Sequence, residues 1–426
     1  MRPQPHPLWT TLKFLPNREG ENRLDDLTDA AFDRPGDASC GVRVGAGSAG
    51  GSRTDSGQAG NFDIVARACQ YLAMKVFDEA AFRRALPFDV RPTDIPGAFD
   101  VPPPPPGFDP RTATAEELRR AGMRWRRSVA NRNPIARALW ERATARTDAP
   151  VGKTVTPYRP PPHPMIPARR RRRLPNESQF NWAGSVVATG RWTAVSGCWV
   201  VPTLSAGSQP AATITYSNGE TFTGWWLSTW LGLDGYIPNN SNDVLQIGIM
   251  QQIDEGNHAY AWAWYEWWLE NPPEGSPTYV NSQLITGFNV NPTDTILAIV
   301  SYVGSMAGQV TLFNLSQWAR DNYVLGTDNY FNRVLAPPPT ADFNGSSAEW
   351  IAEDPGGGEP AYTLSNFTPI NFTGGLACNC PSDLSSMDWA NPSSGIPQEI
   401  ESAGSPPTTL TSTTVGEGTV TIKYVG

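Results

Sequence analysis

The sequence predicts an all-β, antiparallel β-sandwich over residues 174–426, preceded by a partly helical, Pro- and Gly-rich N-terminal extension over residues 1–173. Charge divides the 426-residue chain sharply: the first part holds 29 basic and 19 acidic residues, the second four basic and 22 acidic. Short segments rich in Val, Thr, Trp and Tyr begin only in the second part. Gly, Asn, Pro and Ser separate them at intervals of about ten residues, which is typical of antiparallel sandwiches.

The extension is predicted to hold three short helices joined by linkers. Apolar groups at helical spacing indicate the first over residues 63–84, and a Thr-x-x-Glu capping box and an Asn-Pro start indicate the other two. The predicted N-caps are Asp63, Thr114 and Asn133. Five prolines at 102–106 predict a stiff polyproline spacer.

Two aromatic segments of the second part are predicted to be strands, and period-two alternation sorts their side chains onto faces. One face of the first segment holds Trp226, Ser228, Trp230 and Asp234. One face of the second holds Tyr260, Trp262, Trp264, Glu266 and Trp268. Such an aromatic face with isolated acids is compatible with a concave binding surface and equally with ordinary core between two sheets.

Residue types exclude several kinds of catalytic chemistry. His258 is the one histidine of the second part, so a Ser–His or Cys–His nucleophile would have to use it, and it follows a predicted turn. The histidines and five cysteines form no metal-ligand pattern, so we expect neither a metal nor a cofactor. The Asp-Ser-Gly at 55–57 lies in a Gly/Ser-rich linker and has no second copy, so it does not indicate an aspartic peptidase. Carboxylates and amides remain as candidates for hydrolysis.

Six short motifs stand in the order seen in the glutamic peptidases, or eqolisins, and the chain resembles that family over residues 178–425. The motifs are FNWAGS from Phe180, WVVP from Trp199, WLGLDG from Trp230, VLQIG from Val244, WYEW from Trp264 and AEWIAED from Ala348. The resemblance implies a concanavalin-like sandwich with catalysis on its concave face. It also implies a secreted acid endopeptidase that acts on polypeptides without a cofactor, and we expect a monomer.

The resemblance places the catalytic pair at Gln246 and Glu349. A carboxylate can take a proton from an attacking water and return it to the leaving amine, while a neutral amide can donate a hydrogen bond to the developing oxyanion. The resemblance also places four groups along the substrate cleft, as binding or orienting residues: Trp230, Asp234, Trp264 and Glu266.

Two positions depart from the family pattern. Trp262 stands where family members often carry an acid, which affects one part of the substrate subsite, and Pro355 stands where an aromatic residue is usual. Neither position belongs to the catalytic pair. Glu353, on the same predicted face as Glu349, is expected to be structural or exposed.

Two other functions, action on carbohydrates and nucleic-acid binding, fit parts of the sequence. A carbohydrate-binding or glycan-hydrolysing concanavalin-like module would suit a Trp-lined face and could use Glu266 and Glu349 as its two carboxylates. The sequence lacks the Glu-x-Asp-x-x-Glu strand of such glucanases, which disfavours it. Nucleic-acid binding through the arginines of the extension, including 169–173, is disfavoured by their proline flanks and few aromatic neighbours, so we expect no nucleic-acid partner.

Location and processing are expected from composition. No run approaches the roughly 20 apolar residues that span a bilayer, and the first 30 residues show no secretory signal. The extension has a net charge of +10 and the second part −18, so their attraction should weaken as carboxylates are neutralised below about pH 4. We therefore expect a zymogen that opens in acid and cuts itself near residues 173–176.

Overall fold

The computed structural model describes most of the chain from residue 77 onward. The described residues are 77–105, 107–123, 130–145, 181–215, 221–236, 243–269, 272–273, 275–303, 307–338, 341, 344–355, 363–379, 387–402 and 406–426. The predicted N-cap Asp63, the Gly/Ser-rich linker and the arginine run at 169–173 lie outside them.

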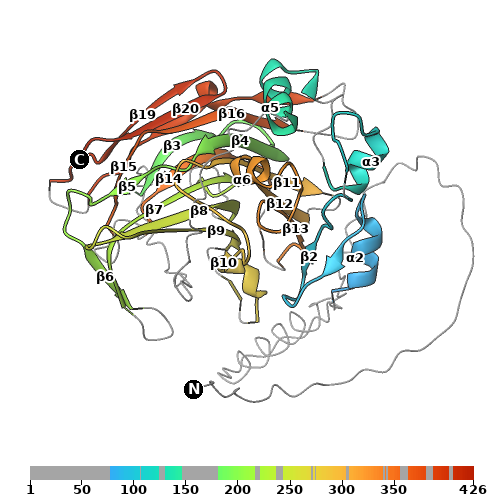
Figure 1. Cartoon of the computed structure of the whole chain (residues 1–426), viewed down its shortest axis with the longest axis horizontal. Helices are drawn as coiled ribbons and strands as arrows, with labels where there is room; N and C mark the ends of the chain where they lie inside the picture. Colours follow the sequence, from blue (N-terminus) through green and yellow to red (C-terminus); the bar gives the residue numbers. More distant parts are fainter. Residues whose placement is uncertain are drawn as a thin grey trace, which may run out of the picture. The chain divides into compact units, whose positions relative to one another are not determined.

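Two antiparallel sheets form the body of the molecule (Figure 1), which confirms the predicted all-β sandwich. The larger, sheet A, has ten strands in the described residues, in the order β1 (Arg91–Pro92), β2 (Ala98–Asp100), β13 (Tyr330–Leu335), β12 (Ala307–Asn314), β11 (Thr295–Val303), β4 (Ala194–Val200), β16 (Ile370–Asn379), β20 (Thr419–Tyr424) and β19 (Thr411–Gly416), with β17 (Asp388–Ala390) paired to β16.

The second sheet, sheet B, has eight strands in the described residues. Its order is β10 (Gln283–Leu284), β9 (Ala259–Trp268), β8 (Val244–Asp254), β7 (Thr221–Leu233), β14 (Ala348–Glu353), β3 (Trp182–Val187) and β18 (Ile396–Gln398), with β6 (Ala212–Thr215) paired to β7. Two of its central strands, β7 and β8, are long, and the neighbouring strand β14 is fully buried. A further two-stranded pair joins β5 (Leu204–Ser205) to β15 (Asn366–Phe367).

Four α-helices and two 3₁₀ turns are present in the described residues: α2 (Glu79–Ala85), α3 (Ala115–Arg120), α5 (Pro134–Thr144), α6 (Leu315–Arg320), η2 (Thr278–Val280) and η4 (Pro392–Ser394). The capping box at Thr114 is confirmed, because its side chain accepts from the Glu117 amide while Glu117 accepts from the Thr114 amide. The start of α5 at Asn133 is likewise confirmed. Of the helix expected at 63–84, the described part begins only at Glu79, capped by Asp78.

The extension also supplies two strands that the sequence did not predict. Strand β2 pairs with β13 of the sandwich, opposing Phe99 to Val334 and Asp100 to Arg333. Phe99 is buried among apolar groups of both parts, Val334 and Val303 included. Residues 91–100 therefore lengthen sheet A, and the strands escaped prediction because they are only two and three residues long and lie between prolines.

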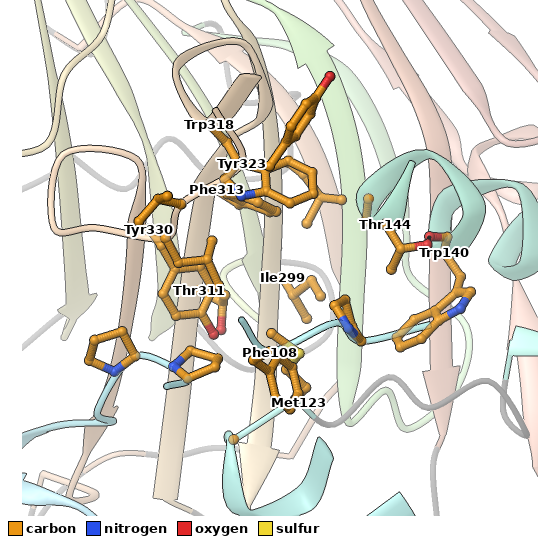
Figure 2. A pocket seen from close by; sticks show the side chains of 18 of the residues that line it. Phe108, Met123, Trp140, Thr144, Ile299, Thr311, Phe313, Trp318, Tyr323 and Tyr330 are labelled. Atoms are coloured by element: carbon orange, nitrogen blue, oxygen red, sulfur yellow. Dashed lines mark hydrogen bonds between the residues drawn. The ribbon is translucent and has the colours of Figure 1, made fainter. Parts of the chain in front are cut away.

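The outer face of sheet A is covered by the extension and by α6 (Figure 2). Alternation along β11 sends Leu297 and Ile299 to this side, where Leu297 packs with Leu139 of α5. Helix α5 lies close to β16: a side chain placed on Gly374 would come within 2.8 Å of the Leu139 Cδ1 atom.

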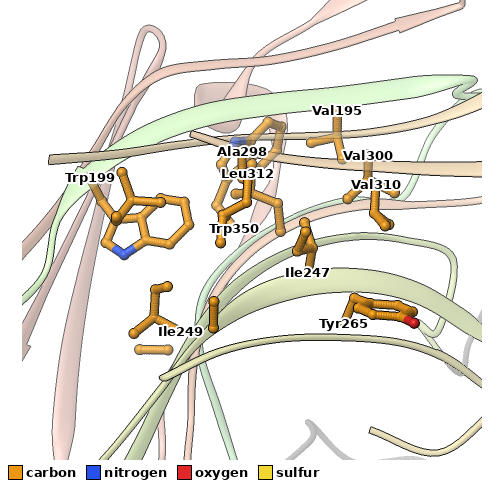
Figure 3. Packing of buried hydrophobic residues seen from close by; sticks show 14 of the residues in the cluster. Val195, Trp199, Ile247, Ile249, Tyr265, Ala298, Val300, Val310, Leu312 and Trp350 are labelled. Atoms are coloured by element: carbon orange, nitrogen blue, oxygen red, sulfur yellow. The ribbon is translucent and has the colours of Figure 1, made fainter. Parts of the chain in front are cut away.

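The main hydrophobic core lies between the two sheets (Figure 3). Val195, Ala298, Val300, Val310 and Leu312 face it from sheet A. Sheet B contributes residues from β8, β9 and β14, among them Ile247, Ile249, Tyr265 and Trp350. Burying this much apolar surface fixes which side of each sheet B strand faces inward, so the alternate residues must form its opposite face.

Candidate active site

The outward face of sheet B carries a row of aligned residues that combines the two predicted catalytic positions. In the strand register, Glu349 of β14 lies opposite Gly232 of β7. Gly232 lies opposite Gln246 of β8, which in turn lies opposite Glu266 of β9. Three consecutive strands and the distant strand β14 therefore place an acid, a glycine, an amide and a second acid side by side.

Gly232 separates the two predicted catalytic side chains and contributes no side chain of its own. Neighbouring strands lie about 4.8 Å apart, so the Cα atoms of Glu349 and Gln246 are about 10 Å apart with Gly232 between them. A Cβ atom added to Gly232 would meet Trp230 at 2.7 Å and the Glu349 Oε2 atom at 3.2 Å. The glycine thus keeps open the space beside the Glu349 carboxylate, between the strands that carry Glu349 and Gln246. The sequence analysis missed this role because strand order is not visible in sequence spacing.

Gln246 is buried, and its amide is oriented by Glu266. Its Nε2 atom donates a hydrogen bond to the Glu266 Oε1 atom. An ionised carboxylate can only accept hydrogen bonds, so the nitrogen must face Glu266. An amide nitrogen carries two hydrogens, which leaves one for another acceptor, and the Gln246 Oε1 atom has no hydrogen-bond partner in the described part of the chain.

Glu349 is fully buried, and neither of its carboxylate oxygens has a hydrogen-bond partner among the described residues. Burial raises the pKa of this carboxyl well above its ordinary value, the Ser347 side chain opposes the rise, and the nearby Asp234 carboxylate adds to it. A buried acid without partners is costly for folding. Buried groups with strongly perturbed pKa values cluster at functional sites.

Asp234 holds the loop that leads into β14. Strand β7 ends at Leu233 and Asp234 has a positive φ of 65°, so its side chain no longer follows the alternation that the sequence predicted. Its carboxylate accepts hydrogen bonds from the Gly345 amide (2.9 Å) and from the Ser346 hydroxyl (2.7 Å). Burial raises the pKa of Asp234, and these hydrogen bonds oppose the rise. Asp234 therefore positions the start of the Glu349 strand.

Trp230 forms a buried floor beside the row. Its indole Nε1 atom donates to Glu353 at 2.8 Å. Glu353 also accepts from Asn181 at 2.8 Å and from Trp182 at 3.2 Å. With three donors around it, Glu353 is structural, one of the two alternatives expected, and it fixes the Trp230 ring.

Trp264 belongs to an aromatic cluster on the same outward face. Trp262, Trp264 and Trp268 are all buried there, which confirms the predicted alternation along β9. The Trp264 Nε1 atom has no hydrogen-bond partner in the described part of the chain. His258, by contrast, lies in the turn between β8 and β9, where its ring contacts Asp254 at 3.0 Å, in agreement with the turn assignment.

Metal ligands, nucleophiles and membrane-spanning helices are the other features that could carry a function. The described residues contain no cluster of three or more His, Cys, Asp or Glu side chains suited to a metal ion. Cys198 is a buried free thiol whose pKa burial raises to about 11, and Cys378 is disulfide-bonded. Within the described residues, no helix combines the length and apolar character needed to cross a membrane.

Comparisons with known proteins identify relatives of the second part of the chain. Aspergillopepsin-2 of Aspergillus niger is 27% identical over 259 residues, which cover 58% of this chain and 79% of that protein. Scytalidopepsin B of Scytalidium lignicola is 28% identical over 178 residues, 41% of this chain and 52% of that protein.

Solved structures give similar matches. Scytalido-glutamic peptidase with a transition state analog inhibitor is 19% identical, covering 58% of this chain and 100% of that one, with a TM-score of 0.41. Aspergilloglutamic peptidase from Aspergillus niger is 24% identical, covering 47% and 99%, with a TM-score of 0.36. The pattern of the peptidase A4 family matches residues 180–424. This match spans more than half of the chain, and the chain therefore belongs to the peptidase A4 family and is a glutamic-type peptidase, a hydrolase.

Proposed function

We propose that this peptidase is an acid endopeptidase in which Glu349 is the general base and Gln246 stabilises the oxyanion. One observation carries the proposal: the two side chains flank the vacant position at Gly232 on one face of sheet B, and each has a buried polar atom without a partner. A peptide bond with its attacking water would supply the missing partners.

The chemistry assigns a separate task to each group. Glu349 takes a proton from water as the water oxygen attacks the scissile carbonyl carbon. The carbonyl oxygen becomes an oxyanion and accepts the second hydrogen of the Gln246 Nε2 atom, which Glu266 orients. Glu349 then returns its proton to the leaving amine, and the C–N bond breaks.

The other predicted residues support this pair. Trp230 and Trp264, both buried, would form apolar walls for substrate side chains. Glu266 orients the Gln246 amide, and Asp234 orients the Glu349 strand through the loop at 344–346. We therefore propose Glu266 and Asp234 as positioning residues rather than direct substrate ligands.

The raised pKa of Glu349 bears on the pH range. A general base must be ionised, and burial without partners opposes ionisation in the free enzyme. Bound water and substrate would donate hydrogen bonds to the carboxylate, which favours its charged form and lowers its pKa. The acid limb of kcat, which reports the substrate complex, should therefore lie at lower pH than that of kcat/KM, which reports the free enzyme.

A glycan hydrolase that uses Glu266 and Glu349 is not favoured by this geometry. Gly232 and Gln246 stand between the two residues in the strand register. The Glu266 carboxylate is also occupied by the Gln246 amide. A glycosidase needs its two carboxyl groups about 5–9.5 Å apart with a sugar between them.

Two matched variants test the assignment, because two buried glutamates, Glu349 and Glu353, lie four residues apart on the same face of β14. Glu349→Gln should abolish digestion of a denatured protein at pH 3 to 5, since the base is lost. Glu353→Gln should keep most of the turnover while lowering thermal stability, because Glu353 serves Trp230, Trp182 and Asn181. Full turnover in Glu349→Gln would refute the proposal.

A further inference from the structure

A cavity of about 410 Å³ lies on the outer face of sheet A, on the opposite side of the core from Glu349 (Figure 2). Strands β11, β12 and β13 and helix α6 form one wall. The other wall comes from the extension, through the prolines at 103–105, Phe108, Met123 and helix α5. The volume falls in the range of about 300–1,000 Å³ that is usual for small-molecule sites.

The described lining of this cavity is mostly apolar and contains no charged side chain. Ile299, Phe313 and Trp318 from the sandwich face Phe108 and Trp140 from the extension across it. The polar lining groups are neutral, such as Thr144 and Thr311. A charged ligand would lose its hydration here without gaining an ion pair, so the lining selects an uncharged molecule.

Three buried polar atoms of lining residues lack hydrogen-bond partners among the described residues: the Tyr323 hydroxyl oxygen, Trp318 Nε1, a donor, and Gln309 Oε1, an acceptor. Trp318 is 5% exposed and Gln309 is 2% exposed. Buried polar atoms are paired in the large majority of cases, so each of these requires an explanation.

The side chains of Gln309 and Trp318 are not free to turn toward another partner. The Gln309 amide is anchored through Nε2, which donates to the Gly122 carbonyl and to Asn332, both at 2.9 Å. The Trp318 ring is held against Phe313, with a centroid distance of 5.1 Å.

We propose that this cavity binds a neutral, mainly apolar organic molecule whose hydrogen-bond acceptor pairs with the Trp318 indole N–H. An aromatic or alicyclic body would fill the space between Ile299, Phe108 and Trp140, and a donor on the same molecule could reach Gln309. The inference does not depend on the peptidase reaction, because none of its residues belongs to the row on sheet B.

Ligand binding in this cavity is coupled to attachment of the extension. A ligand that contacts both walls binds the assembled form and not the separated parts, so it stabilises the assembly by mass action. Amide hydrogen exchange in α5 should therefore slow when the cavity is occupied.

Titration of the full chain with prodan, a neutral naphthyl ketone, tests the proposal. Its emission should shift to the blue on binding, and exchange in Pro134–Thr144 should slow. Trp318→Phe replaces the indole by a smaller phenyl ring without an N–H, and the loss of one neutral hydrogen bond should weaken binding about fivefold. Trp264→Phe is the matched control, because it also removes an unpartnered buried indole N–H, but on sheet B; it should leave affinity unchanged.

A second variant fills the cavity. Ile299→Phe should weaken prodan binding at least about tenfold, since the larger ring occupies the space. If that variant fails to fold, Trp318→Phe alone decides. Failure of prodan to bind the wild-type chain, equal affinity of wild type and Trp318→Phe, or a larger loss in Trp264→Phe than in Trp318→Phe would overturn the proposal.

Discussion

Sheets A and B share one core but differ in what their outward faces bury. Sheet A buries neutral groups, chiefly aromatic and aliphatic side chains covered by the extension and α6. Sheet B buries carboxylates, among them Glu349 with no partner and Glu353 with three. Burying an unpaired charge costs far more than burying a neutral amide or indole. The difference supports the proposals that acid–base chemistry takes place on sheet B and that the cavity on sheet A takes a neutral ligand.

The largest predicted effect that tests this difference between the two faces is the loss of turnover on replacing Gln246. Gln246→Ala should lower kcat about 10²–10³-fold, because the oxyanion loses its donor. Gln309→Ala is the matched control on sheet A, since Gln309 is also a buried strand glutamine with an unpartnered Oε1 atom. Its turnover on a denatured protein should stay within about twofold of wild type when both are assayed below their unfolding temperatures. A Gln246→Ala enzyme with wild-type kcat would remove the distinction between the faces.

A smaller loss is expected at Glu266. Glu266→Gln replaces a group that can only accept by one that can also donate, so the Gln246 amide can be held in either orientation. Misorientation of a reacting group costs up to about 10²-fold, and we expect kcat to fall about 10–10²-fold with KM little changed. Burst and steady-state kinetics on a chromogenic peptide separate the two constants. A change confined to KM would show that Glu266 binds substrate instead of orienting Gln246.

The stability of the folded chain should depend on pH because of the buried Glu349 on sheet B. Because the pKa of Glu349 is raised in the folded state, its contribution to stability is fully present below the unfolded pKa of about 4.3 and is lost as pH rises through the folded pKa. Each unit of difference between the two pKa values corresponds to about 1.4 kcal/mol.

Glu349→Gln lacks this titration, so its thermal midpoint should exceed that of wild type at pH 7 and match it at pH 3 to 4. Differential scanning calorimetry of both proteins across this range is the measurement. A higher thermal midpoint for the wild-type chain than for Glu349→Gln at neutral pH would mean that Glu349 has stabilising partners when ionised.

How far the sequence could predict these two faces depends on whether a feature is local. The motifs led to the prediction of Gln246 and Glu349 as the catalytic pair, because each stands in a distinctive string of residues. Alternation placed Trp264 and Glu266 on one face but failed at Asp234, where a positive φ after the strand end redirects the side chain. The role of Gly232 depends on strand order, which joins residues more than 100 positions apart. The pairing of β2 with β13 depends on contacts between distant residues, and a three-residue strand is too short to show a recognisable alternation of polar and apolar side chains.

The smallest effect concerns the extension. We keep the prediction that the active chain cuts itself near residues 173–176 in acid; this site lies outside the described residues. The charge argument alone would have the cut segment leave at low pH. However, the described part of the extension is joined to sheet A by backbone pairing of β2 with β13 and by apolar contacts of Phe99 and Leu139, none of which titrates.

We therefore expect the cut fragment to stay bound after cleavage. Intact mass at pH 3 should show loss of the link in the wild-type chain but not in Glu349→Gln. Size-exclusion chromatography at the same pH should show both pieces eluting together. Among the described residues, the one ion pair between the extension and the sandwich joins Arg333 to the partly exposed Asp100. This pair weakens in acid, and such pairs contribute about 1 kcal/mol or less. Immediate separation of the pieces at pH 3 would show that charge, and not burial on sheet A, holds the extension in place.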